Sequence, residues 1–197
     1  RMFKRELGVF HGAMREYIEL EPPQLNAIYA TGADWARKKD WTIISTYRTD
    51  TRPAKLVAWE RLGREDWPAM IARFNDRLKR FGGSAVYDGT GIGDVVSGYV
   101  DSATEAFIMV GRNRSDLLSQ YIAAIERGEI EAPLIRFAES EHRLASVEDV
   151  YSGGEKHHLP DSIAAGALAW RAVIKFPPAG ISIKPAQNAF IRKSVLS

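Results

Sequence analysis

Three apolar, strand-like runs follow one another between residues 25 and 62, and their close spacing limits how the chain can fold. The runs are Leu25–Ala33, Trp41–Tyr47, which is rich in β-branched and aromatic residues, and Lys55–Leu62. Only short polar connections, residues 37–40 and 49–53, separate them. Connections of this length join antiparallel neighbours. The spacing therefore predicts a three-stranded antiparallel meander.

After the meander, strand-like and helical patterns alternate. Asp66 and Pro68 mark the start of a helix that Gly82 and Gly83 end. A short strand is predicted over 84–87, a helix from Asp94 onward, a strand over 105–110 and a helix from 115 to 128. Strands that alternate with helices favour parallel pairing through right-handed crossovers. The sequence thus predicts an α/β fold with a mixed sheet flanked by helices.

The ends of the chain have a different character from its middle. Residues 1–24 mix charged and aromatic residues and stop at Pro22-Pro23, which is typical of a linker or short helix. A helix over 134–144 is possible, and an alanine-rich helix from Pro160 offers a small-residue surface for close packing on a sheet. Residues 177–197, with three prolines, are expected to form a loosely attached tail. The predicted domain therefore spans 25–176.

The composition limits which kinds of chemical site the protein can have, but it says little about the fold class. The 197 residues suit one domain with a core, and the chain has no cysteine, which excludes disulfides, thiolate zinc sites and a cysteine nucleophile. Any metal must be held mainly by oxygen, and such sites favour magnesium, manganese or calcium. The formal charge of +2 permits a polyanionic partner. No run reaches membrane-spanning length, so we expect a soluble, intracellular protein. The chain begins with Arg1 rather than Met, which suggests a piece of a longer protein.

Three aspartates occupy positions that folding could gather at one edge of the predicted sheet. Asp34 ends the first strand-like run, Asp88 follows the strand over 84–87 and precedes a glycine-rich turn, and Asp161 opens the alanine-rich helix. Carboxylates held close together repel one another, and they persist mainly where a divalent cation neutralises them. The sequence therefore indicates a metal site.

Each of these residues also has a purely structural interpretation. Asp34 could cap the next turn, Asp88 could belong to an ordinary βα turn, and Asp161 could serve only the helix dipole. His157 and His158 are more typical of loop histidines than of metal ligands. The chain contains no Gly-x-x-x-x-Gly-Lys-Ser/Thr phosphate loop, and its glycine turn lacks the dinucleotide-binding spacing.

Basic residues lie near the predicted acidic centre. Arg37, Lys38 and Lys39 follow Asp34 in a turn, and Arg112 and Arg114 follow the fifth predicted strand. Such side chains suit a phosphate backbone. Solvated turns are the simpler explanation for any one of them.

The combined pattern resembles the C-terminal nuclease domain of a tailed-bacteriophage terminase large subunit, the DNA-packaging motor protein. The resemblance covers most of the chain and is carried by four segments. Residues 3–10 are similar to the exit from the ATPase domain of such proteins. Residues 33–44 resemble the first catalytic strand and the strand after it, residues 86–94 the second motif, and residues 158–165 the third.

The resemblance implies a ribonuclease-H-like fold and metal-dependent cleavage of double-stranded concatemeric DNA. Asp34, Asp88 and Asp161 would be catalytic ligands of two Mg²⁺ or Mn²⁺ ions, about 3.5–4 Å apart. Many relatives carry a further acidic residue before the third aspartate, where this chain has Pro160. Residues 1–24 would connect to a missing ATPase domain. The implied setting is the host bacterial cytoplasm.

The partners that the resemblance implies are double-stranded DNA, the portal protein and the small terminase subunit, with the isolated domain a monomer. Alternative functions are a resolvase or transposase-like nuclease of the same fold, and a non-catalytic DNA-binding or docking module. An actin-like ATPase is disfavoured, because 197 residues are too few for its duplicated architecture.

Overall fold

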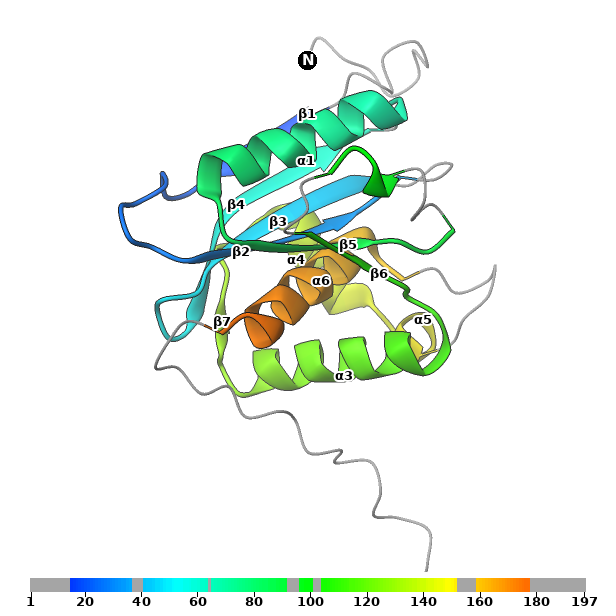
Figure 1. Cartoon of the computed structure of the whole chain (residues 1–197). Coiled ribbons are helices and arrows are strands. Elements are labelled where there is room, and N and C mark those ends of the chain that lie inside the picture. Colours follow the sequence, from blue (N-terminus) through cyan, green and yellow to red (C-terminus); the bar gives the residue numbers. More distant parts are fainter. Residues whose placement is uncertain are drawn as a thin grey trace, which may run out of the picture.

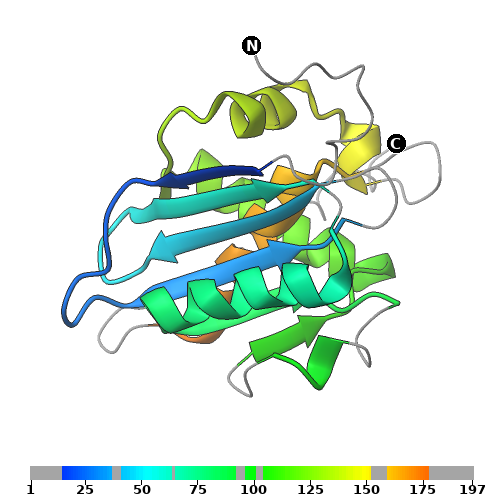
Figure 2. The same cartoon turned by 90° about the horizontal axis from the view of Figure 1, so that it is seen from above.

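A mixed β-sheet with helices on both faces forms the body of the protein (Figures 1 and 2). The computed structural model describes residues 15–36, 41–63, 65–91, 96–100, 104–151 and 159–177. Within these residues the strand order is β1-β4-β3-β2-β5-β6, and β7 pairs with β4 beside this path. The strands are β1 Arg15–Glu19, β2 Tyr29–Asp34, β3 Thr42–Arg48, β4 Ala54–Leu62, β5 Ser84–Asp88, β6 Thr104–Phe107 and β7 Ile130–Glu131.

The predicted meander and the predicted parallel strands are both confirmed. Strands β2, β3 and β4 are successive antiparallel neighbours, whereas β5 runs parallel to β2 and β6 runs parallel to β5. The change from antiparallel to parallel pairing occurs at β2. This strand therefore lies inside the sheet, with partners on both sides.

The segment expected to be a linker or short helix contains the edge strand β1, which corrects that expectation for residues 15–19. β1 pairs antiparallel with β4, and two of its charged side chains meet opposite charges on that strand. Arg15 contacts Glu60 at 2.5 Å, and Glu16 contacts Arg61 at 3.0 Å. The charged residues of this segment argued against a strand in the sequence analysis. The partners that neutralise them lie more than 40 residues further along the chain.

Two other boundaries differ from the sequence expectation. β2 begins at Tyr29 rather than Leu25, because Asn26 adopts a left-handed backbone (φ 64°) that interrupts the extended run. β6 ends at Phe107, and helix α3 (Gly111–Glu126) begins before the expected cap at Ser115. Residues 96 and 97 of the helix expected after Asp94 are helical, and Asp94 itself lies outside the described residues.

Helix α1 (Trp67–Phe81) covers one face of the sheet and has the predicted ends. The Asp66 side chain accepts a hydrogen bond from the Ala69 amide at 3.0 Å, and Gly82 ends the helix with a φ of 67°. Its apolar side packs on the sheet residues that alternate toward it, such as Ala33 of β2 and Tyr87 of β5. The members of this cluster are Ala33, Trp35, Ala36, Ile44, Met70, Ile71, Phe74, Ala85, Tyr87 and Val96.

A buried ion pair lies beneath α1. The Arg77 guanidinium contacts the Glu60 carboxylate at 3.0 Å and donates a hydrogen bond to Thr46 Oγ1 at 3.2 Å. Burial lowers the pKa of Arg77, and the charge of Glu60 opposes that shift. Glu60 also contacts Arg15, so the buried guanidinium of Arg77 is neutralised within a network of three charges.

Helix α6 (Asp161–Lys175) covers the opposite face and packs on β2, β5 and β3. A Cβ atom on Gly32 would lie 2.2 Å from the Ala169 nitrogen and 2.3 Å from the Ala165 oxygen. Glycine at this position thus allows the backbones of β2 and α6 to touch, as the small-residue helix surface predicts. Helix α3 packs beside α6, followed by α4 (Arg136–Leu144) and α5 (Val147–Tyr151). None of the helices in the described ranges is long and apolar enough to cross a membrane.

Candidate metal centre

Asp34 and Asp88 end adjacent parallel strands on the same face of the sheet. In the register of β2 and β5, Gly32 is opposite Val86 and Ala33 is opposite Tyr87, so the next step sets Asp34 beside Asp88. Strand side chains alternate between faces, and Gly32 lies on the α6 face, which puts Asp34 on that face also. The Asp88 residue is buried, whereas Asp34 is half-buried.

The turn after β5 is fixed by hydrogen bonds to itself and to β6. Asp88 Oδ1 accepts from the Thr90 amide at 2.9 Å, and the Gly89 amide donates to the Phe107 carbonyl at 2.9 Å. Thr90 Oγ1 accepts from the Met109 amide at 2.8 Å. Because both ends of the turn are held, the Asp88 carboxylate has a defined position at the rim of the sheet.

Asp161 reaches the same rim from the helix side. Ser84, which pairs with Ala30, donates to the Ala172 carbonyl, whereas Gly32 lies against Ala165 and Ala169. α6 therefore runs antiparallel to β2. Two further residues along β2 span about 6.6 Å, and one helical turn spans about 5.4 Å. The step from Gly32 to Asp34 thus corresponds to the step from Ala165 to Asp161.

Backbone and side-chain contacts hold the first turn of α6. The Trp41 amide, just before β3, donates to Asp161 Oδ2 at 2.8 Å, and Glu141 Oε2 of α4 accepts from the Ser162 amide at 2.8 Å. Two carboxylates at the helix N-terminus are favoured by the helix dipole. The contact with Trp41 draws the Asp161 carboxylate toward β3, on the opposite side of β2 from Asp88.

The carboxylates of Asp34, Asp88 and Asp161 are oxygen ligands of the kind that a hard divalent cation prefers, but the three do not form one compact group in this structure. Among the residues that the structure describes, no group of three or more histidine, aspartate or glutamate side chains is close enough to hold a metal ion. The sheet sets Asp34 beside Asp88, and α6 brings Asp161 to the same rim. The two strand-end carboxylates, with oxygen donors only, fit a magnesium or manganese ion.

The basic residues singled out in the sequence have different surroundings. Arg37, Lys38 and Lys39 lie outside the described residues, as do His157 and His158. Arg112 is exposed in the first turn of α3 and pairs with Asp116 at 3.5 Å. Arg114 donates to the Asp149 carbonyl of α5 at 2.9 Å, and burial lowers its pKa. Arg112 is thus available to a ligand, whereas Arg114 joins α3 to α5.

Trp41 and Glu141 are the site residues that sequence reasoning missed. Trp41 acts through its backbone amide, which any residue except proline could supply, so its side chain carries no signal. Glu141 lies within the predicted α4 helix, 21 residues before the amide that it accepts from. Only a tertiary arrangement of α4 against α6 could reveal its role.

Comparisons with known proteins point to one group of relatives. No protein-family model matches the chain. The terminase large subunit of Thermus virus P23-45 is 25% identical over 111 residues, which is 54% of this chain. The matched region spans 22% of that relative's length.

Solved structures show the same fold more completely. The large terminase nuclease from thermophilic phage G20c, with bound magnesium, has a TM-score of 0.66 and 21% identity over 79% of this chain and 86% of that chain. The nuclease domain of the large terminase from bacteriophage SPP1, with bound manganese, has a TM-score of 0.51 and 10% identity over 73% and 85%. The ribonuclease-H-like mixed sheet and the predicted resemblance to terminase nuclease domains are thereby confirmed at the level of the fold.

Proposed function

We propose that this chain is a metal-dependent endonuclease that cleaves double-stranded DNA. The observation that carries the proposal is the alignment of Asp34 and Asp88 at the ends of adjacent parallel strands, beneath the helix that begins with Asp161. The likeness to terminase nucleases crystallised with magnesium and manganese supports it.

Asp34 and Asp88 would hold the first divalent ion, and Asp161 would complete the site and share in a second. Such ions supply Lewis-acid stabilisation of a phosphodiester and make water a nucleophile at neutral pH. Magnesium and manganese are the ions that this donor set fits best. In this scheme the amide of Trp41 orients Asp161, which keeps one carboxylate oxygen directed toward β3.

Contacts with the DNA backbone would come from basic groups at the same rim. Arg112 is exposed at the N-terminus of α3, where the helix dipole adds to its positive charge. β6 and β5 are parallel and Asp88 pairs with Phe107, so the start of α3 lies just beyond the strand that neighbours Asp88. Arg37, Lys38 and Lys39, which follow Asp34 in sequence, are proposed as further phosphate contacts.

The biological setting follows from the same likeness. The proposed substrate is concatemeric viral DNA, cut during genome packaging in the host bacterial cytoplasm. The proposed partners are the portal protein and the small terminase subunit.

A cleavage assay with matched variants tests the proposal. Supercoiled plasmid is incubated with the protein and either magnesium, manganese or excess chelator. We expect nicking or cutting with each metal and none with chelator. Asp34→Asn and Asp88→Asn should lower the rate by about 100-fold or more, since metal ions contribute several kcal/mol to transition-state stabilisation. Asp76→Asn, at an exposed position on α1, is the control.

A non-catalytic DNA-binding or docking module is the alternative, and the same assay separates the two functions. DNA binding without cleavage in any of the metal conditions would support that alternative and contradict the endonuclease proposal. Preference for four-way junctions over linear duplex would instead indicate a resolvase of the same fold.

A further inference from the structure

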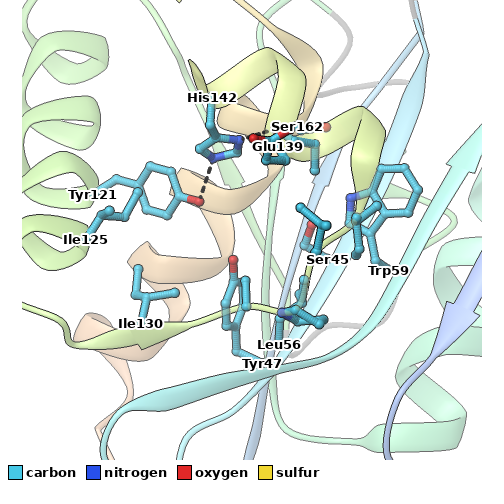
Figure 3. Close-up of a pocket in the computed structure, with 15 residues that line it drawn as sticks. Ser45, Tyr47, Leu56, Trp59, Tyr121, Ile125, Ile130, Glu139, His142 and Ser162 are labelled. Carbon is cyan, nitrogen blue, oxygen red and sulfur yellow. Dashed lines mark hydrogen bonds between the residues drawn. The ribbon is translucent and has the colours of Figure 1, made fainter. Parts of the chain in front are cut away.

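A pocket of about 390 Å³ lies between the sheet and the helices α3 and α4 (Figure 3). Its floor consists of buried side chains that include Tyr47, Leu56 and Trp59, and exposed Ile125 and Leu134 lie at its rim. Binding pockets for small organic molecules have volumes of roughly 300–1,000 Å³ and mainly apolar linings. The size and lining of this pocket are those of a small-molecule site.

The charge of the lining excludes most ionic ligands. Among the described residues that line the pocket there is no lysine or arginine, so an anion would enter without a counter-ion. The single carboxylate, that of Glu139, contacts Arg143 at 2.9 Å, which partly neutralises it. Transfer of an unpaired charge into such surroundings is strongly unfavourable. A fitting ligand is therefore neutral.

One wall of the pocket carries a chain of hydrogen bonds. His142 Nδ1 lies 2.7 Å from the Ala138 carbonyl, which can only accept, so Nδ1 carries the proton in the neutral ring. His142 Nε2 then accepts from the Tyr121 hydroxyl at 3.1 Å. Tyr47, which is buried, also lines the pocket, and in Figure 3 its hydroxyl group points into the same space as that of Tyr121. The oxygen of the Tyr47 hydroxyl has two lone pairs and can accept a hydrogen bond from a ligand in this space.

Ser162 supplies a second polar group. This residue lines the pocket, is 3% exposed, and its Oγ has no hydrogen-bond partner. Buried hydroxyl groups are almost always hydrogen-bonded, so an unpartnered one at a pocket is a position that a ligand can satisfy. The hydroxyl oxygens of Tyr47 and Ser162 both suit a ligand that donates a hydrogen bond.

We propose that this pocket binds a neutral, aromatic small molecule that carries one hydrogen-bond donor, such as a phenol. The aromatic ring lies among the apolar side chains of the floor, and the donor reaches the acceptors near Tyr47 and Ser162. Ser162 adjoins Asp161 in the first turn of α6, but the binding itself requires neither metal nor DNA. The proposal is therefore independent of the proposed nuclease function and is tested without it.

Titration of the isotopically labelled protein with naphthol, followed by NMR, tests the proposal. We expect saturable shifts at the amides of Ala138, His142 and Ser162. Methoxynaphthalene, which has the same rings but no donor, should bind about three- to tenfold more weakly, the effect of one hydrogen bond. Naphthalene sulfonate, an anion with the same rings, should produce no saturable shifts at these amides.

A pocket-filling variant gives an independent outcome. Ala138→Phe should weaken naphthol binding at least tenfold, whereas Ala123→Phe on α3, outside the lining, should leave it unchanged. If Ala138→Phe does not fold, the positions of the naphthol-induced amide shifts in the wild-type protein test the proposal instead. The proposal is overturned if naphthol produces no saturable shifts, if the shifts lie elsewhere, if the sulfonate binds equally well, or if folded Ala138→Phe binds like the wild type.

Discussion

The amide of Trp41 donates a 2.8 Å hydrogen bond to Oδ2 of Asp161, which joins the start of β3 to the first residue of α6 across 120 residues of sequence. This contact orients the third candidate carboxylate from outside its own helix. The three aspartates are therefore positioned in two different ways. Asp34 and Asp88 are set side by side by strand pairing, whereas Asp161 depends on how α6 packs.

Asp161→Ala should impair cleavage less completely than Asp34→Ala or Asp88→Ala. The two strand-end carboxylates remain, so one metal site is weakened while the other persists. Manganese should restore activity better than magnesium, because magnesium requires near-ideal octahedral geometry. Cleavage rates measured against the concentration of each metal test this, with thermal melts to show that all three variants fold. If Asp161→Ala loses as much cleavage activity as the other two variants in both metals, Asp161 is as essential to metal binding as Asp34 and Asp88.

Gly32→Ala should destabilise the protein by about 1–3 kcal/mol or more, because the added methyl group would overlap the backbone of α6 at Ala165 and Ala169. Gly98→Ala is the matched control, since a Cβ atom there meets nothing within 4 Å. The free energy of unfolding in urea measures both effects. Equal stability of the two variants would show that α6 does not lie against β2 as described.

Glu60→Ala should destabilise the protein by about 3–5 kcal/mol, because it leaves the Arg77 guanidinium buried without its carboxylate partner. Replacing both residues, by Glu60→Leu with Arg77→Met, should cost much less, since no buried charge then remains unpaired and Arg15, which also loses Glu60, is partly exposed. Urea unfolding of the single and double variants gives the comparison. A double variant as unstable as Glu60→Ala would mean that packing volume, not charge, dominates at this position.

The stability of the protein should fall at alkaline pH partly through Tyr47. Burial raises the pKa of Tyr47 from 10.0 to about 12. The folded state therefore holds this proton more tightly, and the resulting stability is present below pH 10 and lost as the pH rises toward 12. The unfolding free energy of Tyr47→Phe should thus fall less steeply than that of the wild type above about pH 10. Tyr99→Phe, at an exposed tyrosine, should follow the wild-type curve.

Local sequence predicted the elements whose signals are local. The meander followed from short connections between strand-like runs, and α1 followed from its cap at Asp66 and its end at Gly82. The close approach of α6 to the sheet followed from its small residues, and it is realised at Gly32. In each case the residues whose pattern predicted the element also make the structural contacts that define it.

Features that depend on distant partners were not predictable in this way. β1 is a strand because β4 offers a free edge with matching charges, and β7 is two residues long. Helix α3 begins at Gly111 without a side-chain cap, so the sequence signal at Ser115 was misleading. The contact of Trp41 with Asp161 is made by a backbone amide. The pocket near Tyr47 brings together segments that lie far apart in the chain.

Manganese-soaked crystals, measured at the manganese absorption edge, show whether the two strand-end aspartates bind a divalent ion. Anomalous scattering locates the ion without reference to activity. We expect a peak within coordination distance of the Asp34 and Asp88 carboxylates, absent from Asp88→Asn crystals, with Asp161 turned toward the same rim. Well-ordered crystals that show these two carboxylates free of manganese at concentrations saturating for cleavage would contradict it.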